Sequence, residues 1–165
     1  MSALHSSQSS HRTRHTLLLA CGNALRGDDG VGWRIGRAAE KLPLRSDLSV
    51  ILTHQLLPEH AHEISEAEIV IFVDCSAVAQ PGTVSVLPVE PETTVPCVFT
   101  HHLDPASLLA LARQLYASGP RQAVLITVGG ASFELTDQLS RTVKAAIPVA
   151  LKVICQAFQG AGLSN

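Results

Sequence analysis

Three short polar segments contain the residues of this sequence that could carry chemistry, and each of them borders an apolar run. The stretch Cys21–Gly32 reads CGNALRGDDGVG and places two adjacent carboxylates, Asp28 and Asp29, among four glycines. Asp74 ends the run IVIFVD, and His101–His102 end a proline-rich stretch. Two carboxylates and one imidazole form a ligand set that suits a divalent cation with a preference for nitrogen and oxygen donors.

Each acidic residue also has a purely structural interpretation. An Asp in front of a helix is commonly its N-cap, and this is the usual role for a residue placed like Asp28. One cap needs only one carboxylate, so Asp29 is the stronger functional candidate. Asp74 either takes part in chemistry or initiates the turn that follows it, and its sequence context favours neither interpretation.

The other histidines and the cysteines are weaker candidates. His60 and His62 are two residues apart on a predicted helix and do not share a face, which predicts surface positions. His54 ends a predicted strand and stays a weak candidate for the site. Cys75 follows Asp74, but alternation along an extended chain points the two side chains apart, which disfavours a thiol nucleophile. The four cysteines form no CxxC pair, so we expect reduced thiols rather than a zinc site or a disulfide framework.

The composition and the absent motifs exclude several functions. The phosphate-loop pattern G-x-x-x-x-G-K-S/T does not occur in the glycine-rich segment, where two anions would also repel a phosphate. The G-x-S-x-G elbow of serine hydrolases is missing too. With 46% hydrophobic residues and a net charge of −2, the chain has a globular composition without the basic stripe of a nucleic-acid-binding protein. No apolar run approaches the ~20 residues of a membrane span, so we expect a cytoplasmic protein with no membrane partner.

Alternating strand and helix patterns must position these residues. Strands are predicted at 16–21, 48–53, 67–73, 83–87 and 123–128, and those at 16–21 and 123–128 are expected to be buried. Helices are predicted at 31–42, at 58–65, from 105 to 119 and over 143–158. The connection between the third and fourth strands is short, which allows an antiparallel return, since a parallel crossover needs about a dozen residues or more. The pattern predicts an α/β three-layer sandwich with a mostly parallel five-stranded sheet, one antiparallel strand, and helices on both faces.

One domain accounts for most of the chain. We expect residues 16–160 to form a single α/β domain, with a disordered Ser- and His-rich tail at 1–15 and a short C-terminal tail at 161–165. In sheets of this kind, ligands bind beyond the carboxyl ends of the strands. The three polar segments follow apolar elements in the way that this rule requires.

Taken in order, these segments resemble the NiFe-hydrogenase maturation endopeptidases. GNALRGDDGVG is similar to the family signature G-N-x-L-x-x-D-D/E-G-V/I-G, and HQLLPEHA is similar to an HQLTPELA-like segment. IFVDCSAV, followed by PGTV, resembles the strand that ends in a metal-binding Asp, and THHLDPASLLALA resembles the segment with a metal-binding His. GGASFELTDQLS is similar to a late G-x-S-F-x-x-G-x-x-L-S loop, although Thr136–Asp137 stands where members often have Gly-Glu. The resemblance covers residues 16–158.

The resemblance implies a metal site made by Asp29, Asp74 and His101. Asp29 matches the second acidic position of the signature, and His101 matches a His-x-Leu pattern better than His102 does. The resemblance also implies catalytic roles for Asp29 and Asp74. It further implies substrate contacts from the residues around the site, namely Gly22, Asn23, Asp28, Gly30, His54 and His102.

The reaction implied is hydrolysis of one peptide bond, which removes a C-terminal extension from the large-subunit precursor of a nickel-iron hydrogenase after nickel insertion. The nickel is expected to come with the substrate, and other divalent metals can occupy the same ligands. The metal polarises the scissile carbonyl or activates water, or else Asp29 or Asp74 acts as a general base on water; the sequence leaves these open. We expect a monomer that binds the precursor.

Two other functions fit the same residues. One is a peptidase of the same fold that acts on another substrate. The other is a nickel-binding accessory or scaffold protein that holds a hydrogenase subunit without cutting it.

Overall fold

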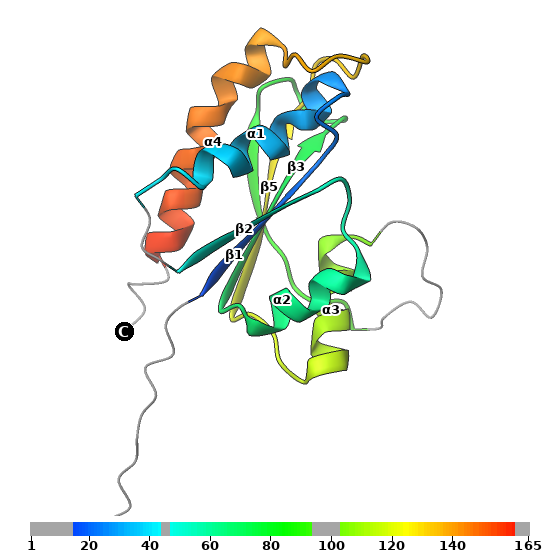
Figure 1. Cartoon of the computed structure of the whole chain (residues 1–165), viewed down its shortest axis with the longest axis vertical. Helices are drawn as coiled ribbons and strands as arrows, with labels where there is room; N and C mark the ends of the chain where they lie inside the picture. Colours follow the sequence, from blue (N-terminus) through cyan, green and yellow to red (C-terminus); the bar gives the residue numbers. More distant parts are fainter. Residues whose placement is uncertain (1–14, 44–46, 94–102, 161–165) are drawn as a thin grey trace, which may run out of the picture.

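The computed structural model describes residues 15–43, 47–93 and 103–160, which form one five-stranded sheet between two layers of helices (Figure 1). The strands are β1 (Thr16–Cys21), β2 (Leu48–Thr53), β3 (Ile69–Ser76), β4 (Val84–Pro88) and β5 (Gln122–Gly129), in the order β2-β1-β3-β5-β4. Only β4 runs antiparallel, and it pairs with β5 at the edge of the sheet. The predicted fold class, including the single antiparallel strand, is confirmed.

Four α-helices and two 3₁₀ turns connect the strands. The helices are α1 (Val31–Ala39), α2 (Ala61–Glu66), α3 (Pro105–Tyr116) and α4 (Arg141–Gly160), and the turns are η1 (Gly27–Gly30) and η2 (Pro58–His60). The helices α1 and α4 cover one face of the sheet, and α2 and α3 cover the other (Figure 1). No helix in the described part of the chain is long and apolar enough to cross a membrane.

The two-residue period of β3 assigns its side chains to the two faces of the sheet. Ile71 and Val73 belong to the core under α1 and α4, whereas Val70 and Phe72 belong to the core under α2 and α3. Cys75 continues the first set and packs against the α1–α4 core. Asp74, the next residue in the second set, therefore belongs to the face of α2 and α3.

Several element boundaries differ from those predicted by a few residues, and two of the differences affect the elements next to the candidate site. The strand β3 continues through Asp74 to Ser76, because these residues pair with the end of β5. Asp74 is thus inside the strand rather than just beyond it. The helix α1 ends at Ala39 instead of 42, since the N–H of Leu42 bonds to the carbonyl of Ala39 in a tighter turn.

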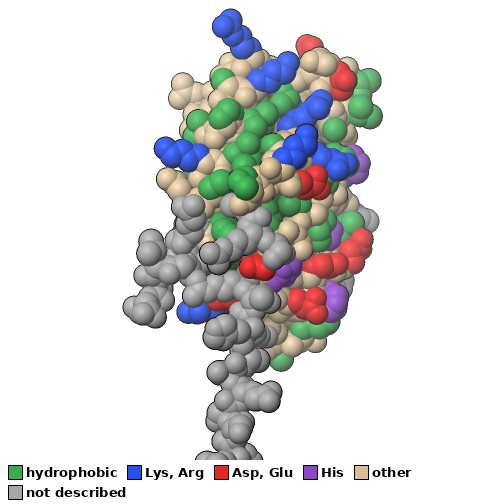
Figure 2. Space-filling model, turned by 60° about the vertical axis from the view of Figure 1, so that its left-hand side comes forward, with side chains coloured by type: hydrophobic (Ala, Val, Ile, Leu, Met, Phe, Trp, Pro, Cys, Tyr) green, Lys and Arg blue, Asp and Glu red, His purple; other side chains and the backbone are tan. Residues whose placement is uncertain are grey.

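The helix layer of α1 and α4 carries only basic charged residues, whereas the layer of α2 and α3 carries charged residues of both signs. Neither α1 nor α4 contains an Asp or Glu, and their exposed cations are Arg34, Arg37, Arg141, Lys144 and Lys152. The short helix α2 contains Glu63 and Glu66. Figure 2 shows Lys and Arg side chains gathered around an apolar stripe in the upper part of the view and Asp, Glu and His side chains in the lower part. The predicted tails fall almost entirely outside the described residues.

Candidate active site at the carboxyl edge of the sheet

Asp28 is completely buried and joins two loops at the carboxyl edge of the sheet. Its Oδ2 accepts hydrogen bonds from the backbone N–H groups of Ala131 and Ser132 (N···O 2.8 and 3.0 Å), and its Oδ1 accepts one from Ser140 (2.6 Å). Burial alone would raise the pKa of this carboxyl, but these hydrogen bonds outweigh burial and lower the pKa.

The interpretation of Asp28 as a helix cap is wrong, because its side chain caps neither η1 nor α1. The substrate contact of Asp28 that the resemblance implies stays a prediction. The structure instead gives Asp28 a positioning role: its carboxylate fixes the loop at 131–140 next to Asp29. The sequence offers no local signal for this role, since the three donors lie more than a hundred residues away.

Asp29 is half-buried and is oriented by a nearby backbone group. The N–H of Asn23 donates to its Oδ2 (3.0 Å). Among the described residues, the other oxygen of Asp29 has no hydrogen-bond partner, so it is available to a ligand. Gly22 is required in this loop because it has a φ of +133° and a side chain there would overlap the carbonyl oxygen of Asp29.

Asp74 lies close enough to Asp29 for the two charges to interact. Burial raises the pKa of Asp74, and the negative charge of Asp29 raises it further, against a hydrogen bond from the N–H of Cys75 to its Oδ1 (2.7 Å). The two carboxylates that the sequence placed 45 positions apart are therefore neighbours in the fold. Two like charges in a partly desolvated site favour a bound cation or a shared proton.

Cys75 does not have the properties of a nucleophile. Its sulfur lies under the late loop, since a side chain at Gly130 would come within 2.9 Å of Sγ. Burial, followed by the charges of Asp29, Asp74 and Asp28, raises the pKa of the thiol to about 12. The thiol is thus protonated at neutral pH, which agrees with the argument from strand alternation.

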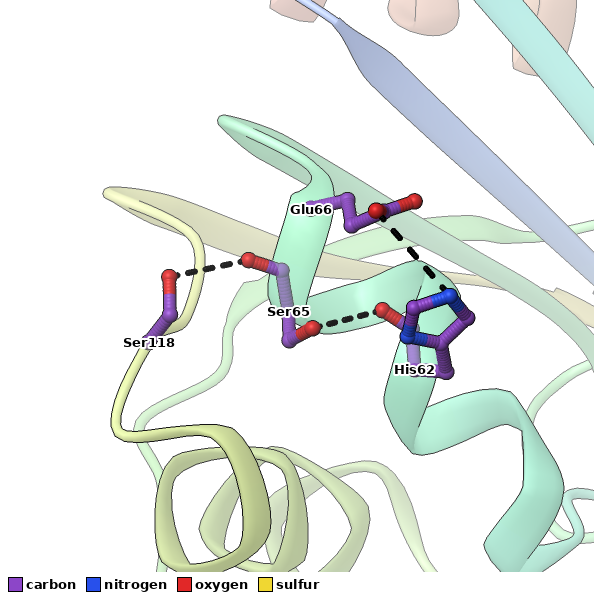
Figure 3. A network of polar contacts seen from close by, with 4 residues as sticks. All are labelled: His62, Ser65, Glu66 and Ser118. Atoms are coloured by element: carbon purple, nitrogen blue, oxygen red, sulfur yellow. Dashed lines mark hydrogen bonds and ion pairs between the residues drawn. The ribbon is translucent and has the colours of Figure 1, made fainter.

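The histidines of the second helical segment are structural, but one prediction about them is wrong. His60 is buried rather than on the surface, and its Nδ1 is satisfied there by a hydrogen bond from the N–H of Leu57 (3.0 Å) at the start of η2. His62 is exposed, as predicted, and lies 3.9 Å from Glu66. Figure 3 shows it in a network in which Ser65 donates to the carbonyl of His62 and Ser118 donates to that of Ser65.

His54 follows β2 at the same edge of the sheet and is exposed. Its ring lies 5.3 Å from that of Trp33, whose Nε1 donates to the carbonyl of Thr53 (2.9 Å). Sequence reasoning missed Trp33 and the organising role of Asn23. For Asn23 a signal existed, because an Asn whose Oδ1 accepts from the N–H two residues later forms an Asx turn, as it does here with Leu25.

The third predicted ligand, His101, and its neighbour His102 lie outside the described residues. Within the described part of the chain, no three His, Cys, Asp or Glu side chains are grouped to hold a metal ion. Asp29 and Asp74 fit a cation by their chemistry, because a positive charge between them relieves the repulsion that raises the pKa of Asp74. The metal site, the catalytic roles of Asp29 and Asp74, and all the predicted substrate contacts stay predictions. Those contacts are Gly22, Asn23, Asp28, Gly30, His54 and His102.

Solved structures of hydrogenase maturation proteases have the same fold as this chain. The chain is similar to the hydrogenase maturating endopeptidase HybD of Escherichia coli, with 27% identity, coverage of 90% of this chain and 94% of that chain, and a TM-score of 0.74. It also has the fold of the NiFe-hydrogenase maturation protease HycI of Thermococcus kodakarensis KOD1, with 21% identity, coverage of 88% and 93%, and a TM-score of 0.67.

A third similar structure is the hydrogenase 2 maturation peptidase of a Thaumarchaeota archaeon, with 23% identity, coverage of 87% and 97%, and a TM-score of 0.65. No protein-family model and no curated protein matches the sequence. The resemblance predicted from the motifs is confirmed, because solved structures named as maturation endopeptidases share the fold over nearly the whole chain. The prediction of an enzyme of this class is confirmed on the same grounds.

Proposed function

We propose that this protein is an endopeptidase that removes the C-terminal extension of a nickel-iron hydrogenase large-subunit precursor. The observation that carries the proposal is the pair Asp29 and Asp74, brought together at the carboxyl edge of a sheet whose fold is shared with a named maturation endopeptidase. The substrate, the timing after nickel insertion and the role of each carboxylate are parts of this proposal.

Asp74 is the candidate general base of the site. Burial and the charge of Asp29 raise the pKa of Asp74 in the protein without a bound cation. In the proposed reaction, Asp74 takes a proton from the water that attacks the scissile carbonyl carbon, and it returns the proton to the leaving amine nitrogen as the C–N bond breaks. Asn23 holds Asp29 in place, with one carboxylate oxygen directed by its N–H.

The nickel ion belongs to the precursor and is part of the substrate. Asp29 and Asp74, with His101 as the resemblance implies, are the side chains that would hold it. When bound, the ion polarises nearby oxygen atoms as a Lewis acid. A precursor without nickel lacks this bridge and leaves two like charges unpaired, which provides discrimination by differential affinity.

The test is incubation of the protein with nickel-loaded and nickel-free large-subunit precursor from the same cell, followed by intact-mass measurement. We expect loss of a C-terminal peptide from the nickel-loaded form only, and no loss with Asp29→Asn or Asp74→Asn. Glu66→Gln is the control, because it removes an exposed carboxylate of α2 whose partner is the exposed His62.

Binding of the precursor without any change of mass supports the scaffold function instead. Cleavage of nickel-free precursor at the same rate contradicts the metal checkpoint and leaves the peptidase activity standing. If the protein neither binds nor cleaves the precursor, the hydrogenase assignment is contradicted.

A further inference from the structure

Two large apolar side chains stand exposed at the carboxyl edge of the sheet, on two loops that meet. Leu25 is 63% exposed, and Leu135 is 89% exposed. The residues that follow them, Arg26 and Thr136, form an isolated parallel β-bridge. The backbones at 25 and 135 therefore lie side by side, although they are 110 positions apart in the sequence.

Hydrogen bonds tie the loop of each leucine to Asp29 or to its neighbour Asp28. Leu25 donates its N–H to Oδ1 of Asn23 (3.0 Å), and Asn23 donates its own N–H to Asp29 (3.0 Å). A single residue thus links Leu25 to Asp29.

The loop that carries Leu135 is held at both ends by Asp28, the neighbour of Asp29. Asp28 accepts hydrogen bonds from the backbones of Ala131, Ser132 and Ser140. The N–H of Gly27 adds a bond to the carbonyl of Thr136 (2.8 Å). Leu135 is therefore held in a fixed place relative to the catalytic carboxylates.

We propose that Leu25 and Leu135, which we call the leucine pair, form an apolar docking surface for the precursor segment that carries the scissile bond. The inference rests on the proposed function. Asp29 lies in the loop that carries Leu25, and the loop that carries Leu135 is bridged to it at Arg26 and Thr136. A precursor segment whose scissile bond lies at Asp29 therefore lies next to both loops. Apolar side chains of the precursor next to the cleaved bond are the chemistry that the pair recognises.

The rigidity of the two loops supports a binding role. An exposed leucine on a mobile loop loses conformational freedom when a partner binds, and this loss offsets part of the apolar gain. Here hydrogen bonds to Asn23 and Asp28 already order the backbone of the two loops. Burial of both side chains by the precursor contributes affinity in proportion to the apolar area removed from water.

The experiment compares Leu25→Ser/Leu135→Ser with wild type in the cleavage of nickel-loaded large-subunit precursor. We expect KM to rise by about 10-fold or more with kcat within about twofold, because the pair binds substrate without touching the reacting atoms. Leu25→Met/Leu135→Met keeps the apolar surface and is expected to keep KM within about threefold of wild type. Leu115→Ser is the matched control, since Leu115 is 59% exposed near the end of α3 and precedes the opposite edge of the sheet.

An unchanged KM in the double serine variant overturns the inference. A wild-type dimer that the serine variant dissociates, with KM unchanged, overturns it in favour of a contact between two copies. If wild type binds the precursor without cutting it and the serine variant binds about 10-fold more weakly, the proposed peptidase fails and the docking surface stands. If wild type neither binds nor cleaves, both proposals fail.

Discussion

Replacing the buried Asp28 by Asn should destabilise the protein without changing the size of the side chain. The carboxylate accepts three backbone hydrogen bonds, two at Oδ2 and one at Oδ1. An Asn that keeps its carbonyl oxygen at the Oδ2 position retains two bonds, now without charge, and turns its NH₂ group toward the N–H of Ser140. That N–H then loses its acceptor and faces a second donor.

The expected cost follows from these losses. A hydrogen bond to a charged group contributes about 1.5–3 kcal/mol and a neutral one about 1, and an unsatisfied buried donor costs about 1–3 kcal/mol. The smaller desolvation penalty of a neutral amide offsets part of this sum. We therefore expect Asp28→Asn to lower the free energy of unfolding by about 2–4 kcal/mol at pH 7.

The pH dependence has a definite sign. The folded pKa of Asp28 is lowered, so its contribution is present above the unfolded value of about 3.9 and is lost as the pH falls through the folded pKa. Urea unfolding at pH 7 and at several values below pH 4 measures this. The difference between wild type and variant should be largest at pH 7 and shrink in acid.

Asp137→Asn is the control for Asp28, because Asp137 is an exposed carboxylate of the same loop. Its free energy of unfolding should stay within about 0.5 kcal/mol of wild type. An Asp28→Asn protein as stable as this control at pH 7, or a difference that grows in acid, refutes the reasoning about the three hydrogen bonds.

Three further substitutions test the site. Asp74→Asn should abolish processing yet raise the free energy of unfolding at pH 7 by about 1 kcal/mol. Burial and the charge of Asp29 raise the folded pKa of Asp74, so the wild type loses stability as the pH rises above about 3.9. Equal urea midpoints of the two proteins at pH 7 count against this. Cys75→Ser should keep the rate of processing within about threefold of wild type, because the pKa of the thiol is about 12 and the thiol is protonated. Processing should also be insensitive to iodoacetamide. Loss of cleavage with an intact fold supports a thiol nucleophile instead. Gly32→Ala should lower the free energy of unfolding by at least about 2 kcal/mol, because the new methyl group would overlap the carbonyl oxygen of Cys21. In an ordinary helix position, Ala is instead more stable than Gly by about 1 kcal/mol. A raised thermal midpoint contradicts this prediction.

Much of the fold is determined by local patterns that the sequence carries. The strands β1 and β2 begin and end where their apolar runs do, and the cap at Asp104 followed by Pro105 marks the start of α3, where the Asp side chain accepts from Ser107. These signals involve neighbours within a few residues, so they can be read without the tertiary structure. The antiparallel β4 is predictable for the same reason, because its connection to β3 is too short for a crossover.

The sequence also determines which residue types are available for chemistry. Asp29 and Asp74 stand out because both follow apolar runs, and the topological rule for parallel sheets then brings them to one edge. The direction of Cys75 away from Asp74 follows from the same two-residue period.

Only the tertiary structure decides what each polar group contacts. The two adjacent Asp residues are compatible with a helix cap, but the donors to Asp28 come from the loop at 131–140. His60 is buried, and its Nδ1 accepts a hydrogen bond from the backbone N–H of Leu57. The adjacency of Leu25 and Leu135 likewise depends on two loops that meet from opposite ends of the chain. Hydrogen bonding and burial act between atoms that are near in space, and separation along the chain does not specify that nearness.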